Sequence, residues 1–227
     1  RDVLGSRGLG DVYKRQVIVT GTPVRGEFAG LSKKQARREL GMDEKEKLVV
    51  SVWGSLGAGH MNSVMTQCIP LMDGTQGFRM IYAAGKAYYP SVLETLEETA
   101  PGLPQRKVDL REYIFDMPRV MAAADLVMCR AGASTISELT YMGLPAILVP
   151  SPNVTNNHQE KNARVLEKAG GAQVLLEGEF DAASLLENVK ALLADEKKLE
   201  AMSAAMRSMS MPDAADKISS IILDILK

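Results

Sequence analysis

The chain has 227 residues, 46% of them hydrophobic and 24% charged, so it is long enough to bury a real core and has the composition of a globular protein. Its 27 lysines and arginines nearly cancel its 28 aspartates and glutamates. This balance gives no electrostatic case for a nucleic-acid partner, which usually leaves a basic footprint. No apolar run reaches the ~18 residues that a membrane span requires, so we expect any membrane contact to be peripheral.

Two cysteines, Cys68 and Cys129, lie far apart and show neither CxxC nor Cys/His spacing. We expect them to be reduced, buried thiols of a cytosolic protein rather than a disulfide or a metal site. The N-terminal region has no apolar core segment, so we expect no signal peptide.

Residues 1–16, RDVLGSRGLGDVYKRQ, show neither a helical nor a strand period and end abruptly before Val17. We expect this segment to be translated adapter sequence and exclude it from the fold. The alternative is a disordered native tail. With either interpretation, the native chain is expected to begin in the middle of a longer protein.

From Val17 onward, short β-rich runs alternate with amphipathic helical patterns. The predicted strands are Val17–Thr20, Leu48–Trp53, Arg79–Ala83, Lys107–Asp109, Leu126–Cys129, Ala146–Val149 and Ala172–Leu175. The predicted helices are Ala58–Leu71, Tyr89–Thr99, Met117–Ala123, Thr135–Tyr141, His158–Ala169 and Ala182–Leu193. Nearly continuous apolar runs such as LVVSVW are typical of parallel strands covered on both faces. The alternation predicts a doubly wound α/β sheet over residues 17–212, with a helical C-terminal end.

Ligands of such sheets bind outside the carboxyl ends of the strands, so the strand-to-helix turns are the candidate sites. The turn from Trp53 to Gly59, WGSLGAG, has glycines that let a backbone approach phosphate, and Ser55 adds a hydroxyl donor. It is neither a Walker A loop nor GxGxxG, and a purely structural turn is the alternative. After the first predicted strand, Arg25 can place a fixed positive charge against a diphosphate.

A second turn, CRAGASTISE, runs from Cys129 to Glu138. Ser134 or Thr135 can cap the helix that follows. Glu138 lies one turn inside this helix, where a carboxylate can accept hydrogen bonds from the vicinal hydroxyls of a ribose. The alternative is that Glu138 only interacts with the helix dipole.

A third turn is the polar loop from Pro150 to Gln159. Its Asn, His and Gln side chains are neutral donors and acceptors, which suit sugar hydroxyls. The alternative is an ordinary connection in which Asn157 caps the next helix. His158 has no second histidine or carboxylate at zinc-ligand spacing, so we expect no metal there.

In order and spacing these turns resemble the C-terminal, donor-binding domain of the MurG family of GT-B glycosyltransferases. The likeness covers residues 17–227 and is strongest in CRAGASTISELTYMGLPAILVP and NNHQEKNARVLEKAGGA. It implies the C-terminal half of a GT-B fold. It also implies a full enzyme that transfers N-acetylglucosamine from UDP-GlcNAc to undecaprenyl-diphospho-muramoyl-pentapeptide, with inversion and without a metal or cofactor.

The resemblance implies a set of donor contacts. Arg25 and Ser55 would approach the diphosphate, and the backbone of Ile114 would read the uracil edge. Glu138 would bind the ribose and Gln159 the GlcNAc hydroxyls. Contacts to the diphosphate and sugar would also come from the run Ala133, Ser134, Thr135, Ile136 and Ser137. Further candidate contacts are Gly54, Gly57 and His158.

Two positions depart from the family pattern. Trp53 replaces the first glycine of the phosphate loop, and Leu56 replaces a commonly polar residue. We expect Trp53 either to pack at the end of its strand or to line the cleft.

The family's N-terminal domain has no counterpart in this sequence. The acceptor groove, the candidate catalytic base and the patch for the cytoplasmic face of the membrane would all belong to it, so the catalytic residues are unknown. Residues 213–227 would dock on that domain, which predicts an exposed apolar stripe formed by Ile218, Ile221, Ile222 and Ile225. Alone, the chain is expected to bind donor weakly and to catalyse nothing.

Other functions stay open. One is a different GT-B UDP-sugar enzyme, such as a diacylglycerol glucosyltransferase or a UDP-GlcNAc 2-epimerase. Another is a nucleotide-sugar-binding module without catalysis. A Rossmann oxidoreductase is disfavoured because no GxGxxG with a downstream acidic residue is present.

Overall fold

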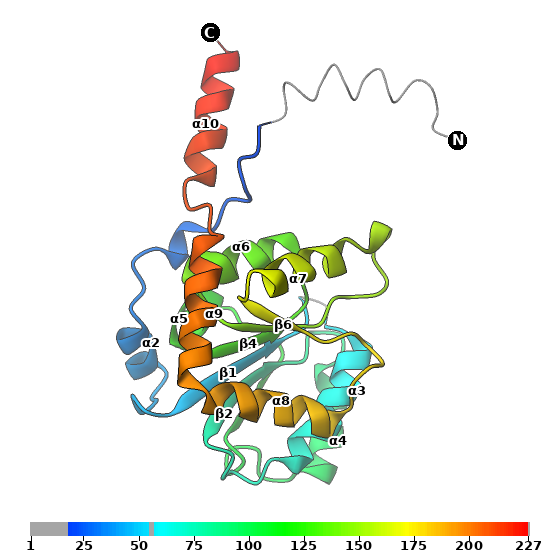
Figure 1. Ribbon diagram of the computed structural model, residues 1–227. Coiled ribbons are helices and arrows are strands. Elements are labelled where there is room, and N and C mark those ends of the chain that lie inside the picture. Colours follow the sequence, from blue (N-terminus) through cyan, green and yellow to red (C-terminus); the bar gives the residue numbers. More distant parts are fainter. Residues whose placement is uncertain (1–17, 55–56, 227) are drawn as a thin grey trace, which may run out of the picture.

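A six-stranded parallel sheet forms the centre of the computed structural model, which describes residues 18–54 and 57–226 (Figure 1). Its strands are β1 (Lys47–Val52), β2 (Phe78–Ala83), β3 (Val108–Arg111), β4 (Leu126–Cys129), β5 (Ala146–Leu148) and β6 (Ala172–Val174). They lie in the order β3-β2-β1-β4-β5-β6, and every neighbouring pair is parallel. The chain winds outward in both directions from β1 and β4, so the switch point where ligands bind in such sheets lies between these two strands.

The predicted strands from Leu48 onward are confirmed, and β4 has the predicted bounds. The first predicted strand, Val17–Thr20, is wrong over the described residues 18–20. Ile18 and Val19 are 62% and 74% exposed and pair with no strand in the described part of the chain. Residues 1–17, and with them the segment expected to be foreign, lie outside the described residues.

One face of the sheet is covered by α3 (Gly59–Cys68), α4 (Tyr89–Thr99) and α8 (Ala182–Ala194). Met61, Leu96 and Leu185 from these helices are fully buried together with Val49 of β1. The short helix η3 (Ile69–Leu71) continues α3. α4 has the bounds that the sequence pattern predicts.

The opposite face is covered by α2 (Lys33–Glu39), α5 (Met117–Ala123), α6 (Ala133–Met142) and α7 (His158–Lys168). Leu48 and Val50 of β1 point to this side, because successive side chains of a strand alternate between the faces. The single-turn helices η2 (Gly26–Phe28) and η4 (Thr155–Asn157) lie before α2 and α7. The sheet is therefore buried on both sides, as the apolar runs predict.

The C-terminal end is helical, as predicted, and its first two helices, α8 and α9 (Glu196–Ser208), begin at side-chain caps. Asp181 and Ser184 form a reciprocal capping box at the start of α8, and Asp195 accepts a hydrogen bond from Lys198 N at the start of α9. Met202 and Met206 of α9 are buried in the core.

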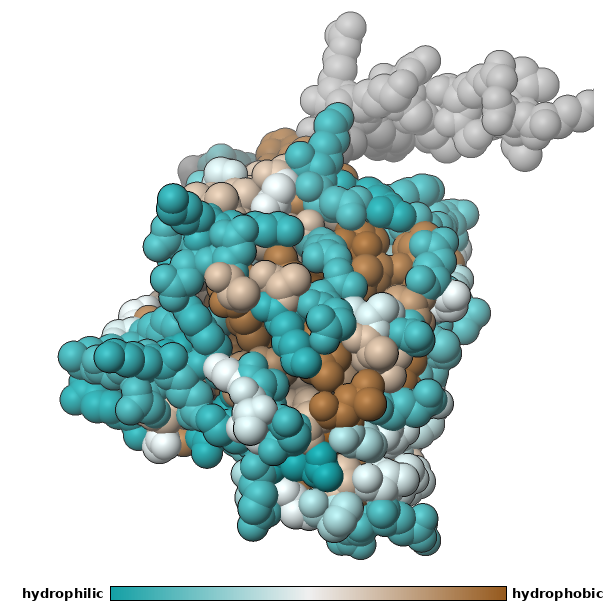
Figure 2. All heavy atoms as spheres, turned by 60° about the horizontal axis from the view of Figure 1, so that its bottom comes forward, coloured by the Kyte–Doolittle hydropathy of each residue, from teal (hydrophilic) through white to brown (hydrophobic). Residues whose placement is uncertain are grey.

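The last helix, α10 (Ala214–Ile225), projects away from the body of the domain (Figure 1). Ile222 and Ile225 are 51% and 77% exposed, and Leu223 and Leu226 are exposed as well, whereas Ile218 and Ile221 are half-buried. The predicted apolar stripe is thus present, extended by the two leucines. The face seen in Figure 2 is largely hydrophilic, with apolar patches between the polar side chains. Within residues 18–54 and 57–226, every helix is too short or too polar to cross a bilayer.

Candidate nucleotide-sugar site

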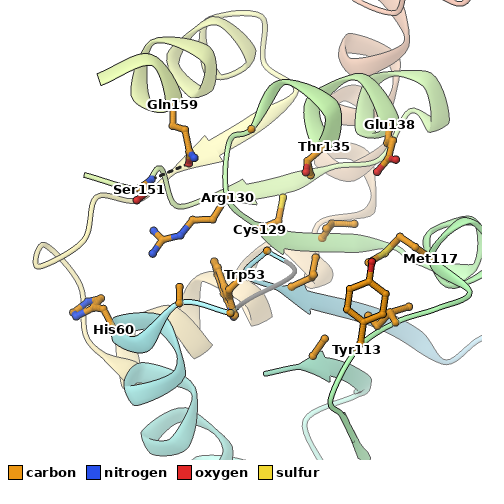
Figure 3. Close-up of a pocket in the computed structure, with 18 of the residues that line it drawn as sticks. Trp53, His60, Tyr113, Met117, Cys129, Arg130, Thr135, Glu138, Ser151 and Gln159 are labelled. Atoms are coloured by element: carbon orange, nitrogen blue, oxygen red, sulfur yellow. Dashed lines mark hydrogen bonds between the residues drawn. The ribbon is translucent and has the colours of Figure 1, made fainter. Parts of the chain in front are cut away.

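A cavity of about 670 Å³ opens where the strand order reverses, at the carboxyl ends of β1 and β4 (Figure 3). Its walls come from the segments that follow β1, β3, β4 and β5. The polar and glycine residues among them include Gly54, Gly57, His60, Glu112, Tyr113, Arg130, Thr135, Glu138, Ser151, Asn153 and Gln159, with Arg25 from the N-terminal segment. The fold therefore brings the three predicted turns and Arg25 together around one space.

The glycine-rich turn after β1 lies close to the backbone that follows β2. Gly57 has φ of +80°, and a Cβ at this position would lie 2.2 Å from the Ala84 carbonyl oxygen. Only glycine fits such a conformation and such a contact. α3 begins directly after Ala58, without a side-chain cap from the described residues, so its first N–H groups are open to an anion. Ser55, which the resemblance places at the diphosphate, and Leu56, which departs from the family pattern, lie outside the described residues.

The run at the start of α6 divides between two faces of the helix. Thr135 and Glu138 line the cavity at the switch point. A second cavity of about 270 Å³, between α6 and α7, is lined by three other residues of the run, Ala133, Ile136 and Ser137. Ser134 is exposed and lines neither cavity. A helix has 3.6 residues per turn, so the side chains of a contiguous run cannot all face one ligand. Any contact from the other members to a ligand at the switch point is left to their backbone N–H groups.

The predicted capping of α6 is wrong. Gly132 occupies the N-cap position, and Ser134 and Thr135 lie within the first turn without a side-chain cap from the described residues. As at α3, the first N–H groups of α6 therefore stay without a side-chain partner, and they lie beside the cavity.

Arg25 and Glu138 form an ion pair across the mouth of the cavity. Arg25 Nη2 lies 3.1 Å from Glu138 Oε1, and Arg25 Nε also donates to this oxygen at 3.3 Å. The Glu138 side chain is 17% exposed, whereas that of Arg25 is 51% exposed. Burial raises the pKa of Glu138, and the charge of Arg25 only partly opposes the effect. Glu138 lines the cavity, and among the described residues only its Oε1 has a hydrogen-bond partner.

If Glu138 binds a ligand as a carboxylate, its raised pKa predicts a pH dependence. A protonated carboxyl accepts hydrogen bonds poorly, so affinity is expected to fall as the pH is lowered through the pKa of Glu138, about tenfold per pH unit below it. The fall should begin at a higher pH than for an ordinary glutamate. Calorimetric titration at several pH values measures this fall in affinity. UDP-GlcNAc is the suitable ligand, because both of its phosphates are esterified and therefore do not titrate in the same pH range. Glu138→Gln is the control and should be weaker but independent of pH. A flat profile for the wild-type chain would contradict the assignment.

The side chain of Gln159, at the start of α7, is oriented by the backbone N–H of Ser151. Its Oε1 accepts a hydrogen bond from Ser151 N at 3.0 Å, as the dashed line in Figure 3 marks. Because the oxygen is engaged in this way, the Nε2 group is free to donate toward the cavity that Gln159 lines. This arrangement suits an acceptor such as a sugar hydroxyl.

His158 does not line the cavity. Its ring is exposed, and Nδ1 lies 3.0 Å from the carbonyl oxygen of Thr155. Asn157 occupies the N-cap position of α7 but has a left-handed φ of +51°, and its side chain donates to Glu160 rather than capping the helix. The alternative of an Asn157 cap is therefore wrong.

The segment after β3 supplies an apolar wall. Ile114 is 2% exposed and lines the cavity, as expected for a residue that offers its backbone to a base. The neighbouring Tyr113 also lines it and packs edge-to-face on Phe115, with ring centroids 4.9 Å apart. Tyr113 was not predicted as a site residue, although an aromatic residue directly before Ile114 was a usable signal.

Arg130 and His60 also line the cavity without having been predicted. Arg130 Nη1 donates to the Val149 carbonyl oxygen at 3.0 Å, and the guanidinium pairs with Glu177. Arg130 directly follows a buried strand, and this position at the carboxyl end of β4 was the available signal. His60 lies in the first turn of α3.

Both cysteines are buried, as predicted, and burial raises the pKa of each thiol to about 12. Cys129 ends β4 beneath the cavity. Thiols of such high pKa stay protonated and unreactive at neutral pH.

Comparison with known proteins agrees with this geometry. Residues 48–218 match the model of the glycosyltransferase family 28 C-terminal domain. The chain is 42% identical over 214 residues to the UDP-N-acetylglucosamine–N-acetylmuramyl-(pentapeptide) pyrophosphoryl-undecaprenol N-acetylglucosamine transferase of Acetivibrio thermocellus, covering 94% of this chain and 57% of that protein. It is 41% identical over 211 residues to the transferase of the same name from Caldanaerobacter subterraneus subsp. tengcongensis, covering 93% and 57%.

The crystal structure of Acinetobacter baumannii MurG has the same fold, with a TM-score of 0.71 at 23% identity, over 88% of this chain and 55% of that one. The chain thus spans a little over half the length of the relatives that it matches. With its doubly wound sheet and its cavity at the β1–β4 switch point, it belongs to the glycosyltransferase family 28 C-terminal domain family.

Proposed function

We propose that this chain is the donor-binding half of a UDP-GlcNAc-dependent glycosyltransferase. The whole enzyme would transfer N-acetylglucosamine to undecaprenyl-diphospho-muramoyl-pentapeptide, which converts lipid I to lipid II in peptidoglycan synthesis. The observation that carries the proposal is the cavity at the β1–β4 switch point, where a half-buried carboxylate, basic groups and two uncapped helix starts converge. Relatives covering the same residues carry this activity in their names.

The two helix starts and the arginines suit the diphosphate. The N-terminal ends of α3 and α6 each offer open N–H groups and a partial positive charge. Arg25 pairs with Glu138 through one oxygen and is half exposed, so a diphosphate can serve as a second anionic partner. When the glycosidic bond breaks, negative charge develops on UDP, and these donors stand ready to stabilise it.

Glu138 and Ile114 suit the uridine. The free carboxylate oxygen of Glu138 can accept from a ribose hydroxyl, and the second hydroxyl can bond the oxygen that Arg25 now contacts. The buried Ile114 backbone would read the uracil edge, with Tyr113 beside it. Gln159, fixed by Ser151, would donate to a hydroxyl of the sugar.

The catalytic base and the acceptor site would belong to the second domain of the enzyme. The exposed apolar residues of α10 would pack against that domain, because a stripe of this size is costly to leave in water. We further propose that the whole enzyme contacts the cytoplasmic face of the membrane peripherally, through that domain. Residues 1–227 alone would bind donor without turning it over.

Donor selectivity tests this proposal. We expect the chain to bind UDP-GlcNAc about tenfold more tightly than UDP-glucose or UDP-galactose, since one well-placed hydrogen bond is worth about 1 kcal/mol or more. Gln159→Ala should remove the preference over UDP-galactose, in which the C4 hydroxyl is inverted, and should leave the preference over UDP-glucose, which differs only at C2, because Gln159 donates to a hydroxyl. Lys161→Gln, an exposed change on the same helix outside the cavity, should retain both preferences. Equal affinity of the wild-type chain for the three donors would reject GlcNAc and favour another UDP-sugar protein of this fold.

A further inference from the structure

Trp53, the only tryptophan of the chain, directly follows β1 at the switch point. It is 2% exposed and belongs to the core on the α3 face, yet it also lines the nucleotide cavity. Both alternatives drawn from the sequence therefore hold: Trp53 packs at the end of its strand and contributes to the cleft. Figure 3 shows it on the cavity floor, below Arg130 and Cys129 and beside the start of α3.

The indole nitrogen of Trp53 has no hydrogen-bond acceptor among residues 18–54 and 57–226. Buried tryptophan N–H groups usually have a partner, and an unsatisfied buried donor is destabilising. Two other polar side chains of this core are paired: Tyr82 Oη donates to Asn62 Oδ1 at 2.6 Å, and Asn62 Nδ2 donates to the Ala84 carbonyl at 2.9 Å. The buried Ser51 hydroxyl, like the Trp53 N–H, has no partner among the described residues, but only Trp53 of these two residues lines the cavity, where a ligand can supply the missing acceptor.

The surroundings indicate which acceptor Trp53 can meet. An indole N–H only donates, so its partner must be an oxygen or another acceptor. The adjacent start of α3 attracts anions through its open N–H groups. Arg130 lines the same cavity, with its charge shared with Glu177. Among the parts of a nucleotide sugar, the diphosphate is the one that this environment favours.

We propose that Trp53 is a donor-binding residue whose indole N–H bonds a phosphate oxygen of the nucleoside diphosphate. The proposal rests on the proposed function, because it assigns one contact within the same site. The nitrogen is covered by neighbouring atoms, so the acceptor reaches it through a small shift of the side chain or of Gly54. Among the described residues other than its chain neighbours, no atom lies within 4 Å of the place where a Cβ of Gly54 would be, which leaves room for this shift.

NMR of the ¹⁵N-labelled 227-residue chain tests the contact directly, because one tryptophan gives one indole N–H signal. We expect UDP to move this signal downfield, as a hydrogen bond to a charged oxygen does, and uridine to leave it nearly unchanged. If UDP binds by calorimetry while the signal stays or moves equally with uridine, Trp53 does not contact phosphate, and the proposed function is unaffected. If UDP does not bind the folded chain, the proposed function itself fails.

Two variants provide an independent measurement. Trp53→Phe keeps an aromatic ring but removes the donor, and we expect it to weaken UDP binding about tenfold without changing uridine binding. Ser51→Ala is the matched control: Ser51 has an equally buried, unpaired hydroxyl on the same face of β1 but does not line the cavity, so UDP affinity should stay unchanged. Unchanged UDP affinity in Trp53→Phe would overturn the proposal. If this variant does not fold, the NMR result on the wild-type chain decides.

Discussion

Replacing Glu138 with alanine is expected to lower the affinity of the chain for UDP at least about 100-fold. The variant removes two hydrogen bonds from ribose hydroxyls to a carboxylate, and bonds to charged groups contribute about 1.5–3 kcal/mol each. It also leaves Arg25 without the partner that now holds it 3.1 Å away at the cavity mouth. Calorimetric titration of UDP into both proteins measures the difference.

Glu27→Ala is the matched control for this experiment. Glu27 also lies beside Arg25, at 4.0 Å, but it is 72% exposed and does not line the cavity. Its removal should leave UDP affinity nearly unchanged. If Glu138→Ala binds UDP as tightly as the wild type, Glu138 is not the ribose acceptor and serves only the start of α6.

Replacing Asp125 with alanine is expected to destabilise the fold by about 3–5 kcal/mol, because it leaves a buried arginine without its counter-charge. Arg37 of α2 reaches Asp125 Oδ2 at 2.5 Å, and their side chains are 7% and 9% exposed. Asp125 also accepts from Lys33 Nζ at 2.8 Å and from the backbone N–H of Leu48 at 2.7 Å. Urea unfolding measures the loss of stability.

An exposed ion pair of the same helix, α2, serves as the control for this loss of stability. Lys34 and Glu44 lie 3.0 Å apart with side chains 66% and 64% exposed, so Glu44→Ala should cost less than about 1 kcal/mol. Asp125 directly precedes β4, at the amino ends of the strands, whereas the cavity lies at their carboxyl ends. Folded Asp125→Ala should therefore still bind UDP normally. Equal stability losses in the two variants would contradict the role of the buried pair.

The sheet was predictable from the sequence because its strands are local patterns. The apolar runs around Leu48 and Leu126 locate β1 and β4 without knowledge of any partner, and the period of Tyr89–Thr99 gives α4 with its observed bounds. α2 was not predicted, since its sequence KKQARRE has little apolar period. A contact between residues 88 apart, from Arg37 to Asp125, ties this helix to the domain.

The site was predictable only in part, for a similar reason. The position of its turns follows from the doubly wound sheet, so Glu138 and Gln159 were predicted from the strand ends, whereas Ile114 came only from the family resemblance; all three line the cavity. The direction of each side chain depends on the helix period and on distant partners. Arg25 and Glu138 meet across 113 residues of sequence, and a run treated as one contact segment divides between two cavities.

The Trp53 position shows how a departure from a family pattern can be interpreted. A tryptophan in place of a loop glycine could have closed the cavity, but its ring packs into the core while its edge still lines the cleft. The larger side chain is therefore compatible with a nucleotide site, and it adds a donor that glycine lacks.

Competition calorimetry tests the central claim most directly, namely that the cavity at the β1–β4 switch point binds a uridine diphosphate sugar. We predict that UDP-GlcNAc binds the folded 227-residue chain at one site and that UDP displaces it, whereas ADP at the same concentration does not. Absence of UDP-GlcNAc binding, or equal displacement by ADP and UDP, would contradict it.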